Sequence, residues 1–127
     1  MLRPSRHLLR LLPFALLLAL SACAGSLLSR AREAERVGAH YEAERLYKEL
    51  YKSTPTRERK RRALYSLCAA EAAYRGRRYA TARALLQRAR RLHLPDSLLR
   101  KSKLFTTLST EALQAEASSP QGLYEVE

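Results

Sequence analysis

The stretch YEAERLYKEL, from Tyr41 to Leu50, decides the fold expected of this chain. Its apolar and small residues recur at positions i, i+3, i+4 and i+7, which lie on one face of a helix. They are Ala43, Leu46, Tyr47 and Leu50, and the opposite face is expected to carry charged residues such as Glu44. The spacing predicts an amphipathic helix over residues 41–53 whose apolar stripe packs against neighbouring helices.

Glycine and proline positions divide the rest of the chain into further helices. The sequence predicts helices over residues 28–37, 41–53, 55–75, 80–92 and 98–117. Thr54 is expected to cap the third helix and Pro55 to begin it, while Pro95-Asp96-Ser97 caps the fifth. The third helix is expected to turn inward Leu64, Leu67, Cys68 and Ala72. The fifth is expected to place on one side Leu98, Phe105, Leu108, Ala112 and Ala115. No alternating β-branched run indicates a strand, so the predicted class is all-α.

A second stretch, YATARALLQRA from Tyr79 to Ala89, repeats the pattern of the first. Both contain a small residue, a large residue four positions later and an apolar or small residue three further on. These residues are Ala43, Tyr47 and Leu50 in the first copy and Ala82, Leu86 and Ala89 in the second. Each copy follows a helix and a glycine turn and precedes a proline. The recurrence predicts stacked helical pairs, with the fifth helix covering the last apolar edge.

The two copies resemble the tetratricopeptide family, whose signature places a glycine between two helices, an alanine five residues later, a large residue four after that and a final proline. The first copy matches at Gly38, Ala43, Tyr47, Leu50 and Pro55. The second keeps the spacing at Tyr79, Ala82, Leu86 and Ala89, although Gly76 and Pro95 are each displaced by one residue. The two alanines lie 39 residues apart, whereas the family repeats every 34 or so. The resemblance implies a short tetratricopeptide-like helical-hairpin solenoid of about five helices; an unrelated five-helix bundle is the alternative.

The N-terminal segment has the parts of an export signal. Arg3, Arg6 and Arg10 precede the apolar run LLPFALLLAL, and small residues follow it. The sequence LSAC, residues 20–23, resembles the lipobox of bacterial lipoproteins. The resemblance implies cleavage between Ala22 and Cys23, with diacylglycerol and an N-acyl chain attached to Cys23. An ordinary secretory signal or an uncleaved anchor is the alternative, but the strongly apolar run is only about half as long as the ~20 residues that a spanning helix needs.

These features predict four segments in the chain. They are a signal peptide over residues 1–22, a lipidated tether over 23–29, a helical domain over 30–117 and an acidic tail over 118–127. The lipid anchor implies a bacterial cell envelope location. Ala24 stands where aspartate retains lipoproteins in the inner membrane, so the outer membrane is favoured, with the domain on its periplasmic face. No cofactor beyond the covalent lipid is expected.

The chain is strongly basic, with a formal net charge of +12. Basic runs near the expected helix ends could form one electropositive ridge, and its candidate anion-binding residues are Arg59, Lys60, Arg61, Arg62, Arg77, Arg78, Arg90 and Arg91. The export signal argues against nucleic acid as the partner and favours the anionic lipids and polymers of an envelope. A solvated basic surface without a ligand is the alternative.

Residues able to carry catalysis are few. His40 and His93 have no second ligand at metal-site spacing, and no phosphate-binding glycine loop is present in the sequence. Cys68 lies in an apolar run and is expected to be a small buried residue. Glu71 is expected to pair with Arg75 or with a base on the next helix. The sequence therefore predicts neither an enzyme nor a metal site.

The tetratricopeptide resemblance implies a binding module. The expected function is a membrane-tethered scaffold that binds a protein partner in an envelope assembly for secretion, pilus formation or outer-membrane biogenesis. Tyr51, Tyr65 and Tyr74 are available for such contacts. The alternative is a small structural envelope protein whose basic ridge binds anionic lipid, lipopolysaccharide or cell-wall polymer.

Overall fold

The computed structural model of the protein describes residues 25–118, and these residues are almost entirely helical. A helix over residues 25–36 is followed by α2 (His40–Ser53), α3 (Arg59–Arg75), α4 (Tyr79–Arg91) and α5 (Asp96–Ala117). No strand occurs between residues 25 and 118. The all-α class predicted from the sequence is therefore confirmed.

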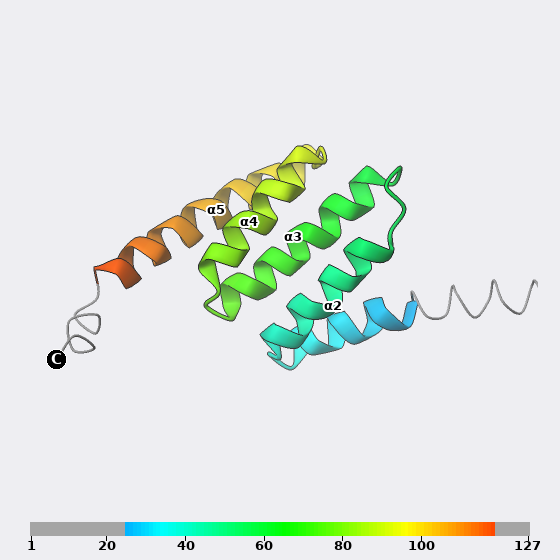
Figure 1. The fold of residues 1–127 in the computed structure, drawn as a ribbon, viewed down its shortest axis with the longest axis horizontal. Coiled ribbons are helices and arrows are strands. Elements are labelled where there is room, and N and C mark those ends of the chain that lie inside the picture. The colour runs from blue at the N-terminus through cyan, green and yellow to red at the C-terminus, as the bar shows by residue number, and fades with distance from the viewer. Residues whose placement is uncertain (1–24, 119–127) are drawn as a thin grey trace, which may run out of the picture.

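The helices form a stack of antiparallel hairpins in chain order (Figure 1). Consecutive helices make most of the tertiary contacts, and α5 also reaches α3. The second half of α5 extends past the turn between α3 and α4 (Figure 1). The predicted helical-hairpin arrangement is confirmed, and residues 25–29, which the sequence assigned to a tether, belong to the first helix.

The core is rich in alanine. In α3, the middle helix of the stack, Ala63, Ala69, Ala70, Ala72 and Ala73 are all buried. Alanine loses no side-chain entropy in a helix, and its small size allows neighbouring helices to approach on more than one side. Leucines fill the remaining space, and the most deeply buried are Leu46, Leu67 and Leu86. Stability in this domain therefore depends on close helix contact.

The predicted start of the third helix was wrong. Thr54 closes α2, because its Oγ1 donates to the carbonyl oxygen of Leu50 at 2.7 Å and its backbone N–H donates to the same oxygen at 3.1 Å. Threonine commonly forms such a bond to the carbonyl four residues earlier. Pro55 then begins a turn, in which the Glu58 N–H donates to the Pro55 carbonyl, and α3 starts at Arg59.

The inner face of α5 also differs from the prediction. Its fully buried residues are Ser102 and Ser109, seven positions apart. Leu98 and Phe105 are partly buried against the core, whereas Ala115 is exposed. Two serines permit a close approach of α5 that larger side chains would prevent. Asp96 and Ser97 make no side-chain capping bond, so the predicted cap of this helix was wrong as well.

Candidate functional site

The residues that carry the repeat pattern lie mainly in the core between helices. Six of them are nearly inaccessible to solvent: Ala43, Tyr47, Leu50, Ala82, Leu86 and Ala89. Tyr79 is partly buried against Tyr74, and Pro55 is exposed in the turn after α2. The inward prediction for α3 holds for Leu67 and Ala72 and was wrong for Leu64, which is 39% exposed.

The two helix-to-helix turns have corresponding backbone hydrogen bonds 39 residues apart. The Ala39 N–H donates to the Ala34 carbonyl at 2.8 Å, and the Arg78 N–H donates to the Ala73 carbonyl at 2.8 Å. Three more backbone N–H groups of the first turn donate to a carbonyl oxygen, and each has its equivalent 39 residues later. In the first turn the bonds are Val37 to Glu33, Gly38 to Glu35 and Ala43 to Ala39. In the second turn they are Gly76 to Ala72, Arg77 to Tyr74 and Ala82 to Arg78. The pattern is that of a Schellman turn. The two hairpins thus repeat in backbone geometry as well as in sequence.

The displaced glycine of the second copy has an explanation in these turns. Gly38 has a φ of 76°, and the residue at the corresponding position of the second turn is Arg77, with a φ of 62°. Gly76 has an ordinary φ of −82°. A Cβ at Gly76 would lie 3.3 Å from His40 Cβ and 3.3 Å from the Ala72 carbonyl oxygen. Gly76 therefore lets the second turn approach α2, while Arg77 adopts the left-handed conformation.

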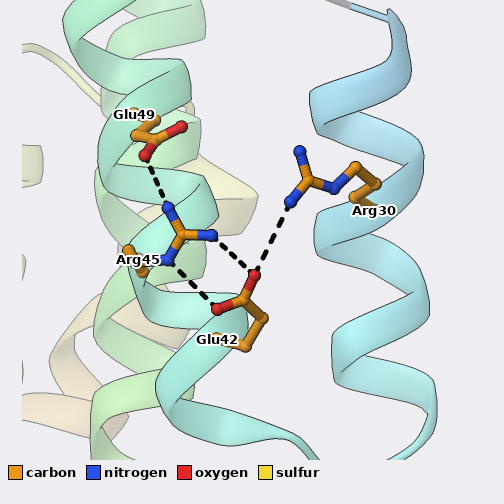
Figure 2. A network of polar contacts seen from close by, with 4 residues as sticks. All are labelled: Arg30, Glu42, Arg45 and Glu49. Carbon is orange, nitrogen blue, oxygen red and sulfur yellow. Dashed lines mark hydrogen bonds and ion pairs between the residues drawn. The ribbon is translucent and has the colours of Figure 1, made fainter.

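Ion pairs connect the outer face of the first hairpin (Figure 2). Arg45 contacts Glu42 at 2.6 Å and Glu49 at 2.7 Å, and Arg30 from the first helix lies 3.8 Å from Glu42. All four side chains remain about half exposed, so solvent and salt screen these pairs and their contribution to stability is small. Their charges are mutually compensated on this face.

Glu44 was expected on the polar face of α2 and is instead only 2% exposed. Its carboxylate pairs with Arg78, at the N-terminus of α4, and with Lys48 at 2.9 Å. The contact with Arg78 explains the burial, because it brings the turn between α3 and α4 onto α2. Periodicity alone could not reveal this, since Arg78 is distant in sequence.

The structure separates the predicted anion-binding residues into two groups. Arg59 Nη2 donates to the Arg91 carbonyl at 3.2 Å, which brings the start of α3 to the end of α4. The loops after α2 and α4 lie at this same end of the stack (Figure 1). We call this region the basic end, and it contains Arg57, Arg59, Lys60, Arg61, Arg62, Arg90 and Arg91. Arg77 and Arg78 lie at the opposite end, in the turn between α3 and α4. The eight candidates therefore do not form one ridge.

Two further arginine contacts lie where α2, α3 and α4 meet. The guanidinium carbon of Arg62 lies 4.3 Å from the ring centre of Tyr51, and that of Arg88 lies 3.5 Å from it. Arg88 Nε donates to Ser66 Oγ at 3.0 Å, and this hydroxyl donates to the Leu85 carbonyl at 2.8 Å. Burial lowers the pKa of Arg88, Tyr51 opposes that shift, and the neighbouring positive charge of Arg62 adds to it. Sequence reasoning missed Arg88 because three helices create its surroundings.

Cys68 and Glu71 lie on the part of α3 that faces α5. Glu71 Oε1 lies 2.6 Å from Lys101 Nζ on α5, so the prediction of a partner at Arg75 or on the next helix was wrong. Burial raises the pKa of the Cys68 thiol to about 12, and the negative charge of Glu71 adds to that shift. A thiol held in its protonated form is a poor nucleophile.

Residues 25–118 contain no group of three or more histidine, cysteine or acidic residues placed to hold a metal ion. Ala22 and Cys23, the predicted cleavage and lipidation residues, lie outside the described residues, as does most of the acidic tail. Among the described helices, none combines the length and the apolar character needed to cross a membrane. The chain matches no protein-family model, no curated protein and no solved structure.

Proposed function

We propose that this protein is a lipid-anchored helical-repeat scaffold that binds a protein partner in a bacterial envelope assembly. The observation that carries the proposal is the repetition of the helix-turn-helix geometry at 39 residues, including the left-handed residue of each turn. Stacked helical pairs of this kind present extended surfaces to other proteins. The export signal and the lipobox-like LSAC sequence supply the envelope setting, with Cys23 as the lipidated residue.

Exposed apolar residues indicate where a partner would bind. The large ones are Val37, Tyr41, Leu64 and Leu104, of which Tyr41 is 68% and Leu104 57% exposed. The tyrosines expected for this role are less available, because Tyr51 stacks with two arginines, Tyr74 packs on Tyr79 and Phe105, and Tyr65 is partly buried against the core. We therefore assign the partner contacts to Leu104 on α5 and Tyr41 at the start of α2.

Site-specific photocrosslinking in intact cells tests this assignment. A photoreactive residue at position 104 should give a discrete crosslinked product, whereas one at Gln87, a polar exposed residue of α4, should not. Leu104→Asp should remove the product formed at position 41 without changing the helix content of the protein. Crosslinks of equal yield at positions 87 and 104, or none at 41 and 104, would contradict the scaffold proposal.

The anchor is tested separately by Cys23→Ser. This variant should leave the membrane fraction, and the crosslink at position 104 should be lost with it if the assembly is reached through the lipid. We propose the outer membrane, on its periplasmic face, as the location, and secretion, pilus formation or outer-membrane biogenesis as the class of assembly.

The basic end favours one other function, which is binding of anionic lipid, lipopolysaccharide or cell-wall polymer. Each base near an anionic membrane surface contributes about 1 kcal/mol of attraction, and salt screens it. Flotation of the unlipidated chain from Ala24 onward with phosphatidylglycerol vesicles tests this function. Salt-sensitive flotation supports it, and absence of binding at low salt rejects it.

A further inference from the structure

Arg62 and Arg88 form a pair of like charges in the described part of the chain. Both guanidinium carbons lie close to the Tyr51 ring centre, at 4.3 and 3.5 Å, so their separation cannot exceed the sum of those two distances. Neither arginine forms an ion pair with any of residues 25–118. The nearest turn of the chain holds one acid, Glu58, and that carboxylate pairs with Arg61 at 3.3 Å.

Stacking on the ring leaves hydrogen-bond donors unused. A stacked guanidinium presents its flat face to the aromatic ring, and its five N–H groups point outward along its edges. Arg88 uses its Nε on Ser66, whereas Arg88 Nη2 and Arg62 Nε are buried without any acceptor among the described residues. Buried donors without a partner in a folded protein commonly indicate a water or an ion that completes the site.

The arrangement restricts what could complete the site. A water could accept from these donors, but only an anion would also offset the two neighbouring positive charges. A carboxylate is planar, and one guanidinium group can donate to both of its oxygens through two parallel hydrogen bonds. A phosphate has oxygens in several directions, so it can accept hydrogen bonds from two arginines that approach from different helices. Arg62 comes from α3 and Arg88 from α4. Phosphate therefore fits two donors from separate elements better than a carboxylate does.

We propose that Arg62 and Arg88, held over Tyr51 where α2, α3 and α4 meet, form a binding site for a phosphate group. Arg62 and Arg88 donate to the phosphate oxygens, and Tyr51 and Ser66 hold the two guanidinium groups in place. The site is specific, in contrast to the diffuse attraction of the exposed arginines at the basic end. It does not depend on the proposed scaffold role, since neither Leu104 nor Tyr41 contributes to it.

Titration of the lipidated protein in zwitterionic detergent with inorganic phosphate tests the site. Arginine Nε–Hε resonances, observed by NMR at slightly acidic pH, should shift saturably for Arg62 and Arg88 and much less for Arg90 and Arg91. Arg62→Gln with Arg88→Gln should weaken phosphate binding about tenfold or more, as expected for loss of charged hydrogen bonds. Acetate at equal ionic strength should shift the same resonances less than phosphate.

The matched control is Arg75→Gln with Arg83→Gln, which removes the same two charges from exposed positions of α3 and α4 outside the basic end. This variant should keep phosphate affinity within about twofold. Equal weakening by both double variants, or shifts that grow linearly without saturation, would overturn the proposal. Should the Arg62/Arg88 double variant fail to fold, Arg88→Lys retains the charge but lacks the planar fork. It should still weaken binding, and unchanged affinity in that variant would equally overturn the site.

Vesicles distinguish the source of the phosphate. Competition of phosphatidylglycerol vesicles, but not phosphatidylcholine vesicles, with inorganic phosphate would show that the site accepts an accessible lipid headgroup. Binding of inorganic phosphate without such competition would assign the site to a free or small-molecule phosphate. Both outcomes support the site. It is rejected if neither the parent protein nor the Arg62/Arg88 double variant binds inorganic phosphate and both bind the vesicles equally well.

Discussion

Ala82→Leu is expected to lower the free energy of unfolding by about 1–3 kcal/mol, because it adds three carbons where the core has no room for them. Ala82 is fully buried in the first turn of α4. Its N–H donates to the Arg78 carbonyl at 2.9 Å, and Arg78 is itself paired with the buried Glu44. The backbone at this point is therefore restrained from two sides, and the larger side chain must displace a neighbouring helix.

The matched control is Ala84→Leu, an exposed position on the same helix. It adds the same carbons to solvent, and leucine and alanine are both good helix formers, so stability should stay within about 0.5 kcal/mol of the parent. Denaturant and thermal unfolding followed by circular dichroism measure the difference. For a domain of this size each kcal/mol shifts the Tm by about 4–8 °C. An Ala82→Leu protein as stable as the Ala84→Leu control would refute the helix packing described here.

Three further predictions follow from other contacts. Gly38→Ala should lower the free energy of unfolding by about 1–2 kcal/mol, because the φ of Gly38 is 76° and a side chain is strained there. Arg77→Gly removes the side chain from the corresponding left-handed position and should raise the free energy of unfolding by up to about 1 kcal/mol. Changes of the same sign in thermal unfolding would show that the two turns are not equivalent. Burial raises the pKa of Cys68 to about 12, so the folded state keeps a proton that the unfolded chain releases above about pH 8.5, and stability should fall as the pH rises beyond that value. Cys68→Ala should reduce that slope in unfolding measured from pH 8 to 10, and an unchanged slope would argue against the buried thiol. A double-mutant cycle on Glu71 and Lys101 should give a coupling below about 1 kcal/mol that salt weakens, because Lys101 is half exposed; a coupling above about 2 kcal/mol would contradict this.

The sequence predicts α2 and α4 well because both helices carry a strong apolar stripe on one face. In α2 the stripe of Leu46, Tyr47 and Leu50 appears in the core as expected. The start of α3 could not be predicted from the sequence in the same way. Thr54 and Pro55 match the start of a helix as well as they match the end of the preceding one, and the bond from Thr54 to Leu50 decides between them. Ser102 and Ser109 are polar by composition, so only the close approach of α5 accounts for their burial.

The functional surfaces depend even more on tertiary structure. The basic runs are obvious in the sequence, but the antiparallel course of the helices places Arg59 beside Arg91 and puts Arg78 at the other end. The proposed phosphate site combines side chains from three helices, and in the sequence Arg88 is only one of several arginines in a basic run. Arg77 likewise occupies a position at which the repeat pattern calls for glycine.

Mass spectrometry of the mature protein, extracted from membranes of the cells that produce it, is the decisive test of the proposed lipid anchor. We expect an N-terminal peptide that begins at Cys23 and carries the mass of diacylglycerol and an N-acyl chain. The precursor should accumulate when lipoprotein signal peptidase is inhibited. A mature chain that starts elsewhere, or an unmodified Cys23, would contradict the lipid-anchored scaffold.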